Sequence, residues 1–257
     1  MLVILSRLFF CLKKMIRSSG MPELIVANWK SQKSLTQAEA WLQTVHDLLG
    51  AFPPDFSLPK DTTIALTPPF PFIVPLRSAI EKLGWQLGVQ DISPFPAGSY
   101  NGAVSGVNLQ GLGVKYTLVG HSERRRYFHE TVQTVARKIE QALDVGITPI
   151  ICVDQQTVEA QAAALDEGLN GQWLVAYEPA QAIGSGHNVP LSEVKEFQSK
   201  VQRLFGAVPF LYGGSVDELN ISEYLLVTDG AIISTASLDA KQFVTVLKTA
   251  LGIPKAK

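Results

Sequence analysis

The sequence contains three side chains that could together move a proton at carbon: Lys30, His121 and Glu178. Each follows a short apolar run, so we expect each near the end of a buried strand. A carboxylate can take a proton from a carbon beside a carbonyl, and an imidazole can hydrogen-bond the oxygens of the resulting enediolate. An ammonium group can offset the developing negative charge. The three residue types therefore predict proton abstraction beside a carbonyl.

A glycine-rich turn, Gly213-Gly214-Ser215, follows a later apolar run. Such a turn could present backbone N–H groups to a phosphate. When parallel strands close into a barrel, the loops that follow the strands share one rim, and phosphate sites often lie after the seventh and eighth strands. The combination predicts a phosphorylated substrate held beside the proton-transfer groups.

The elements that must position these residues are short apolar runs, rich in Val and Ile, as is typical of strands buried on both faces of a parallel sheet. The eight runs cover residues 24–27, 63–66, 86–89, 116–119, 148–152, 173–176, 208–212 and 230–233. They alternate with stretches of helical spacing, among them one that we expect Thr36 to cap with Glu39, and one that we expect Thr131 to cap.

Eight strands alternating with helices predict an α/β protein with one closed (β/α)8 barrel of parallel strands, which we assign to residues 21–257. A doubly wound open sheet is the alternative. It is disfavoured because no glycine-rich dinucleotide turn follows the first apolar run.

At the residues that carry the chemistry, the chain resembles the triosephosphate isomerases. The matching strings are ANWK, LVGHSERRRYF, AYEP followed by AIGSG, and YGGSV, and the resemblance runs from Pro22 to about Leu251. It implies a TIM barrel that interconverts dihydroxyacetone phosphate and D-glyceraldehyde 3-phosphate in glycolysis and gluconeogenesis. No cofactor and no metal ion are implied. The alternatives are another sugar-phosphate chemistry and a non-catalytic barrel, which would be expected to lose Lys30, His121 or Glu178.

The resemblance also implies roles for single residues. Glu178 would move the proton between the two carbons, and His121 would act as a neutral electrophile at the start of a short helix. Lys30 would supply positive charge, and Asn28 would orient Lys30 and contact the substrate. Glu123 would lie beside Lys30 without touching the substrate.

Phosphate binding would involve Gly184, Ser215 and the segment after the eighth strand, Ser234 and Thr235. Residues 179–186 resemble the closing lid of the family, which would keep water away from the enediolate. Cys152 is expected to be a small buried side chain without a catalytic role.

Several residues depart from the family pattern near the substrate. Gln181 replaces a Trp of the lid, Val153 and Asp154 replace a Gly and a Glu, and Ser234-Thr235 replaces a Gly pair. The added Cβ atoms at Ser234 and Thr235, and a need for positive φ there, predict weaker phosphate binding. We also expect these residues to open the final helix.

The resemblance further implies a homodimer built around the loop of residues 98–105. In that loop, Asn101 replaces a Thr and Ala103 replaces a Glu. Ala103 cannot make the ion pair that the usual Glu makes with an Arg, here expected to be Arg124. An uncompensated Arg124 would weaken the dimer.

Composition narrows the possible partners. The 257 residues carry a net charge of −1, and the pI is about 6.4, so no basic surface for nucleic acid is indicated. Two cysteines, Cys11 and Cys152, form neither a disulfide framework nor a metal-ligand cluster, which favours a cytoplasmic location.

The first 20 residues do not continue the barrel pattern. An apolar run is followed by Lys13, Lys14 and Arg17, which is the reverse of a secretory signal, and the run is too short to span a bilayer. We interpret residues 1–20 as an extension, either disordered or produced by an upstream start codon. A weak membrane-surface anchor and a targeting segment are the alternatives, and we expect no membrane partner.

Overall fold

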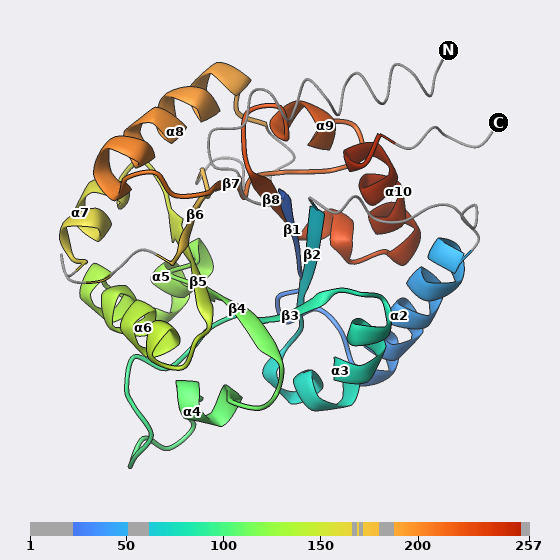
Figure 1. Cartoon of the computed structure of the whole chain (residues 1–257), viewed down its shortest axis with the longest axis horizontal. Helices are drawn as coiled ribbons and strands as arrows, with labels where there is room; N and C mark the ends of the chain where they lie inside the picture. Colours follow the sequence, from blue (N-terminus) through green and yellow to red (C-terminus); the bar gives the residue numbers. More distant parts are fainter. Residues whose placement is uncertain (1–22, 51–61, 166–168, 170–171, 180–187, 253–257) are drawn as a thin grey trace.

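A computed structural model of the chain describes residues 23–50, 62–165, 169, 172–179 and 188–252. Its strands form one closed barrel in sequence order, in which each strand runs parallel to both neighbours (Figure 1). The strands are β1 (Glu23–Asn28), β2 (Thr62–Thr67), β3 (Gln86–Val89), β4 (Val114–Val119), β5 (Thr148–Val153), β6 (Leu174–Tyr177), β7 (Phe210–Tyr212) and β8 (Gly230–Ile233). The prediction of a single (β/α)8 barrel is confirmed, and the open-sheet alternative is wrong.

The apolar runs are nearly continuous because both faces of each strand are buried. Leu24 and Val26 belong to a cluster of side chains inside the barrel, whereas Ile25 and Ala27 pack outward against the helices. Side chains of a strand alternate between its two faces, so both sets must be apolar. At the closure of the barrel, a Cβ on Gly230 would lie 2.0 Å from the Leu24 carbonyl oxygen, so this position needs glycine.

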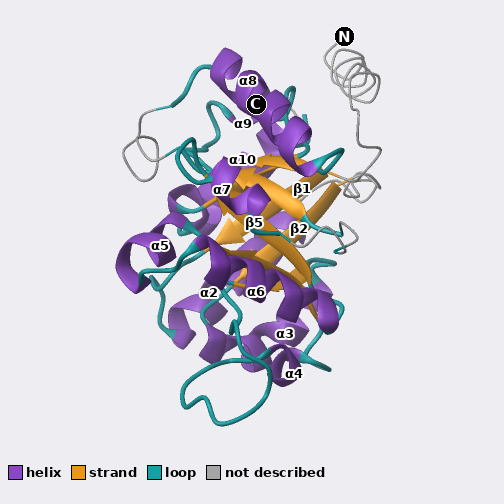
Figure 2. Cartoon of the chain, turned by 90° about the vertical axis from the view of Figure 1, so that its left-hand side faces the viewer, coloured by secondary structure: helices purple, strands orange, loops and turns teal. Residues whose placement is uncertain are grey.

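Helices surround the barrel, and their apolar faces complete the outer core (Figures 1 and 2). The α-helices are α2 (Leu35–Gly50), α3 (Ile73–Lys82), α4 (Gly106–Leu109), α5 (Ser122–Phe128), α6 (Val132–Asp144), α7 (Val158–Ala163), α8 (Leu191–Phe205), α9 (Ile221–Tyr224) and α10 (Ala240–Ala250), with 3₁₀ turns η1 (Phe70–Phe72) and η2 (Thr235–Ser237). None of the helices in the described part of the chain has both the length and the apolar character that crossing a membrane requires.

Two helix caps test the local predictions. Thr131 caps α6 as expected, because its side chain accepts a hydrogen bond from the Thr134 N–H. The prediction for Thr36 is wrong, since α2 begins at Leu35. Ser34 and Gln37 form the reciprocal pair instead: the Gln37 N–H donates to Ser34 Oγ, and the Ser34 N–H donates to Gln37 Oε1. A hydroxyl two residues earlier offers the same capping chemistry.

The long connection between β3 and α4 leaves the barrel and returns beside α4 (Figures 1 and 2). Residues 95–103 of this connection are exposed. Residues 1–20 lie outside the described part of the chain, so their assignment as an extension stays a prediction.

Candidate active site

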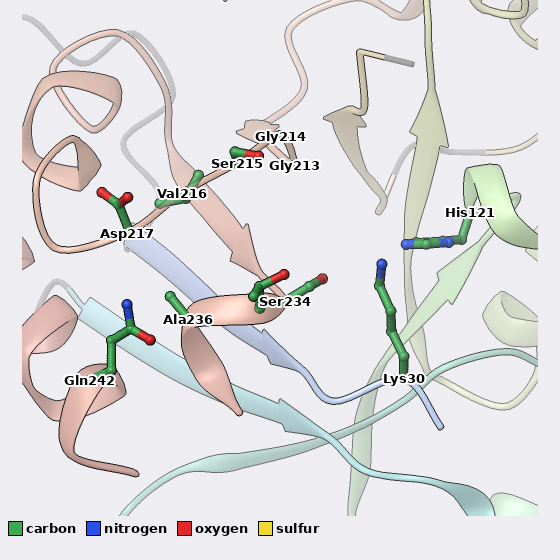
Figure 3. A pocket seen from close by; sticks show the side chains of 11 residues that line it. Lys30, His121, Gly213, Gly214, Ser215, Val216, Asp217, Ser234, Ala236 and Gln242 are labelled. Atoms are coloured by element: carbon green, nitrogen blue, oxygen red, sulfur yellow. The ribbon is translucent and has the colours of Figure 1, made fainter. Parts of the chain in front are cut away.

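The carboxyl ends of the strands surround a cavity of about 190 Å³ (Figure 3). It is lined by Lys30, His121, Gly213, Gly214, Ser215, Val216, Asp217, Ser234, Thr235, Ala236 and Gln242. Residues from strands far apart in the sequence thus meet at one rim, as their positions after the apolar runs predicted. Asp217 and Gln242 were not anticipated. The position of Asp217, two residues after Ser215, was the available signal.

Lys30 follows β1 and has an unusual backbone conformation. Its φ is 50°, in the left-handed region that non-glycine residues adopt at a cost of about 1–3 kcal/mol. The Lys30 N–H donates to Asn28 Oδ1 at 3.1 Å, and Gln90 Nε2 donates to the Lys30 carbonyl at 2.7 Å. Asn28 therefore touches Lys30 as expected. Gln90 was missed, although a polar residue directly after a strand was a usable signal.

The Lys30 side chain ends next to the helix that begins after β4. Its Nζ lies 2.8 Å from Glu123 Oε1, so Glu123 occupies the expected place beside Lys30. The pair is partly exposed, and its Coulomb attraction is correspondingly screened. Its main consequence is that the ammonium group has a fixed position at the cavity wall.

His121 is the N-cap residue of α5, and its ring is buried. The Glu123 N–H donates to His121 Nδ1 at 3.2 Å. A backbone N–H can only donate, so Nδ1 is unprotonated and a neutral ring carries its proton on Nε2. The geometry therefore suits a neutral hydrogen-bond donor.

Glu178 follows β6 and has only 2% of its surface exposed. Its Oε2 accepts from the Ser122 N–H at 3.0 Å, and its Oε1 lies 3.4 Å from His121 Nε2. It lies in a small recess beside the main cavity, together with Ser122, Arg125 and Cys152. The carboxylate and the imidazole are thus direct neighbours, and the carboxylate must turn toward the cavity to meet a substrate.

Cys152 and Arg125 form the wall behind Glu178. Cys152 lies inside β5, and its side chain belongs to the cluster inside the barrel. Burial, reinforced by the negative charge of Glu178, raises the pKa of the Cys152 thiol well above its usual value. The interpretation of Cys152 as a small buried side chain fits this environment. Arg125 donates to the Gly120 and Cys152 carbonyls and to Gln161, and so ties α5 to β4 and β5.

On the opposite side of the cavity, the glycine-rich turn after β7 passes close to neighbouring side chains. A Cβ on Gly214 would lie 2.2 Å from the Tyr212 hydroxyl oxygen, so the turn requires glycine there. Ser215 follows at the cavity wall. The turn thus lies across the cavity from Lys30 and His121 (Figure 3).

Ser234 and Thr235 line the cavity, but two predictions about them are wrong. They open the 3₁₀ turn η2 and not the final helix, because α10 starts only at Ala240 after the Asp239 cap. Ser234 has a φ of −102°, and neither residue has a positive φ. A β-branched side chain therefore meets no left-handed backbone here, and the conformational argument for weak phosphate binding fails.

Gly184 and Gln181 lie outside the described residues, as does nearly all of the expected lid of residues 179–186. Of that segment, the structure describes Pro179, which is buried directly after Glu178.

Arg124 also departs from its prediction. Its guanidinium lies 2.9 Å from Asp91 Oδ2 and also pairs with Glu130, and both carboxylates belong to the same chain. Ala103 therefore does not leave Arg124 uncompensated, and the predicted reason for a weak dimer is wrong. No local sequence pattern predicts this contact, because Asp91 and Arg124 lie far apart in the chain and on separate elements.

Comparisons with known proteins identify the family of this chain. The triosephosphate isomerase family model matches residues 23–250. A triosephosphate isomerase of Dehalococcoides mccartyi is 34% identical over 253 residues, which cover 90% of this chain and 97% of the relative. Those of Albidiferax ferrireducens and Thermus thermophilus are 32% and 31% identical, covering 89% and 88% of this chain and 98% of each relative. The chain belongs to the triosephosphate isomerase family.

Proposed function

We propose that this chain interconverts dihydroxyacetone phosphate and D-glyceraldehyde 3-phosphate by proton transfer through an enediolate, as an enzyme of glycolysis and gluconeogenesis. The observation that carries the proposal is the placement of Glu178 Oε1 3.4 Å from His121 Nε2 beside a cavity that also holds Lys30. A base, a neutral hydrogen-bond donor and a cation are the groups that an enediolate needs.

In this mechanism, Glu178 removes a proton from one carbon of the substrate and returns it to the neighbouring carbon. The Nε2–H of His121 donates to the two oxygens between which negative charge moves, and the hydroxyl proton of the substrate passes from one of these oxygens to the other beside Nε2 as the carbonyl group changes carbon. Lys30 offsets that charge. Asn28 positions Lys30, because the Asn28 side-chain oxygen accepts a hydrogen bond from the Lys30 backbone N–H. The burial of Glu178 strengthens these interactions, because the low dielectric of the site screens them less than water would.

The phosphate would bind at the wall formed by Ser215, Ser234 and Thr235, with Gly184 as a further contact from outside the described residues. Ser215 of this wall lies across the cavity from Lys30 and His121, and Ser234 lies on the side away from His121 (Figure 3). A triose phosphate has its reacting carbons at one end and its phosphate at the other, so a two-ended cavity suits it. No cofactor is required, because each step moves only a proton.

A direct test follows the reaction in deuterium oxide. The purified chain should convert glyceraldehyde 3-phosphate to dihydroxyacetone phosphate, with solvent deuterium appearing at the carbon that receives the proton. The Glu178→Gln variant is the matched control, since it keeps the side-chain shape but removes the base. Turnover by wild type no faster than by this variant would contradict the proposal.

We also propose a homodimer in which the loop of residues 98–105 contacts a second copy. Exposed aromatic side chains support this: Phe95 and Tyr100 stack with ring centroids 4.5 Å apart, and Tyr127 and Phe128 of α5 are exposed. Exposed aromatic groups of this kind are typical of protein interfaces. Sedimentation should give a dimer, and a fully active monomer at micromolar concentration would refute this assembly.

The cysteine content supports a proposed cytoplasmic location. We further propose that residues 1–20 are dispensable, because the first strand begins only at Glu23. A chain that starts at Met21 should match the full chain in activity and melting temperature. A loss of several degrees would mean that the extension packs on the barrel.

A further inference from the structure

Four charged side chains form a cluster beside the active site, away from the cavity: Asp91, Arg124, Glu130 and Lys138. Lys138 Nζ lies 2.5 Å from Asp91 Oδ1 and also pairs with Glu130, and Arg124 pairs with both carboxylates. The side chains of Lys138 and Glu130 are only 2% and 4% exposed. Two cations and two anions balance one another, as buried charges must.

The cluster is connected to the active site through consecutive residues. Gln90 donates to the Lys30 carbonyl at 2.7 Å, and the next residue, Asp91, holds Arg124. Arg124 directly follows Glu123, whose side chain pairs with the Lys30 ammonium group. These contacts form a closed circuit, by which we mean a ring of linked residues. The ring joins the Lys30 backbone to Gln90 and Asp91 after β3, then to Arg124 and Glu123 of α5, and returns to the Lys30 side chain.

The helix α5 needs such an anchor because apolar packing does not fix it. It is seven residues long, and none of its side chains is fully buried. The helix nevertheless has to keep two residues in place relative to Lys30. These are its N-cap residue His121 and Glu123 in its first turn. Arg125 ties one side of α5 to β4 and β5, and Arg124 ties the other side to Asp91 and Glu130.

We propose that Asp91 is a positioning residue of the isomerase site, which holds α5 through Arg124 and thereby sets the positions of His121 and Glu123. This inference rests on the proposed isomerase function. Asp91 touches no substrate and acts only through Arg124. Burial raises the pKa of the Asp91 carboxyl, and Lys138 and Arg124 offset that effect only in part. A buried ion pair is weak evidence for stability, so the geometry of α5 accounts better for a carboxylate placed here.

The Asp91→Asn variant tests the proposal. It leaves Arg124 and Lys138 to share Glu130, so α5 should shift and carry His121 with it. A displacement of about 1 Å at a reacting group can cost on the order of 100-fold, and we expect kcat to fall by at least about tenfold. KM should change by less than about threefold, because the proposed phosphate wall lies in the turns after β7 and β8 and not on α5.

The matched control is Val45→Ala, which removes buried apolar volume from α2 and touches none of the circuit. Both variants are assayed at a temperature where circular dichroism shows them folded. Val45→Ala should lower the melting temperature and leave kcat within about twofold of wild type. If Asp91→Asn keeps kcat as well as this control does, the positioning role is refuted.

A second measurement does not depend on activity. The ¹⁵N signal of His121 Nδ1 reports the hydrogen bond from the Glu123 N–H, so it should change in Asp91→Asn and not in Val45→Ala. An unchanged Nδ1 signal in Asp91→Asn also overturns the proposal. An inactive wild type with the expected signal change would instead refute the isomerase function alone.

The Asp91→Glu variant serves if Asp91→Asn does not fold. It preserves the charge balance but moves the carboxylate along by one methylene. We expect a smaller drop in kcat, of about threefold to tenfold, with the same change in the Nδ1 signal. Wild-type kcat and an unchanged signal in a folded Asp91→Glu variant would contradict the proposal.

Discussion

The two ends of the active-site cavity are built in different ways. At the end with Lys30, His121 and Glu178, chemically active side chains are held by hydrogen bonds to defined partners: Asn28 and Glu123, the Glu123 N–H, and the Ser122 N–H. At the other end, the proposed phosphate wall consists of the turn after β7 and the turn η2, and neighbouring side chains hold the backbone of these turns through its carbonyls. Asn220 donates to the Ser215 carbonyl, and Ser237 donates to the Ser234 carbonyl.

This difference has a consequence for mutations. A side chain that reacts must keep its atoms within a fraction of an ångström, so shortening it should affect kcat strongly. A backbone turn keeps its N–H donors through most substitutions, so changes there should affect binding modestly. The catalytic end should therefore be sensitive in kcat, and the proposed phosphate end should be sensitive in KM.

The largest effect is expected for Glu178→Asp. Removing one methylene moves the carboxylate roughly 1 Å from the substrate carbon, which can cost on the order of 100-fold in kcat. KM should change little, since the phosphate wall is intact. Steady-state kinetics with glyceraldehyde 3-phosphate measure both constants, and Glu39→Asp, on the exposed face of α2, is the control. A Glu178→Asp variant with more than half of wild-type kcat would show that Glu178 is not the base.

An intermediate effect is expected for Glu123→Gln. The Lys30 ammonium group would lose its anionic partner at 2.8 Å, while the Glu123 N–H to His121 Nδ1 bond would remain. Because the pair is partly exposed, its contribution is limited to about 1 kcal/mol, or about fivefold in kcat/KM. The loss should shrink at high salt as the wild-type pair is screened. A loss that is independent of salt would mean that the screened charge attraction between Glu123 and Lys30 is not the cause of the loss.

The sequence predicted the part of this site that depends on residue type and order. Eight apolar runs located the strands, and polar residues shortly after them located Lys30, His121 and Ser215 at the cavity and Glu178 in the recess beside it. Two further features depended on information that a local pattern does not contain. Ser34 and Thr36 offer the same capping chemistry, so composition could not decide between them. The contact of Arg124 with Asp91 joins separate elements, and the backbone angles at Ser234 are set by the packed turn.

The smallest effect is expected at the phosphate end, for Ser234→Gly combined with Thr235→Gly, and its direction is the reverse of the one that sterics alone predicted. Neither residue has a positive φ, so glycine relieves no strain there. Glycine instead adds freedom to a turn that has to be ordered around the phosphate, at a cost of about 0.5–1 kcal/mol per residue. The cost is smaller than this sum, because Ser237 still donates to the carbonyl of residue 234 in the double variant and so restricts the turn. Any hydrogen bond from the Ser234 or Thr235 hydroxyl to the phosphate would be lost as well.

We therefore expect KM for glyceraldehyde 3-phosphate to rise by about threefold, and inhibition by inorganic phosphate to weaken in proportion, while kcat stays within about twofold of wild type. Steady-state kinetics with and without phosphate measure all three quantities. The control is Ser199→Gly on α8, which adds backbone freedom away from the cavity and should leave KM unchanged. A lower KM in the double variant would mean that the two Cβ atoms obstruct the phosphate despite their ordinary backbone angles. A fall in kcat instead would mean that the two ends of the cavity are coupled, and the division between a side-chain end and a backbone end would not hold.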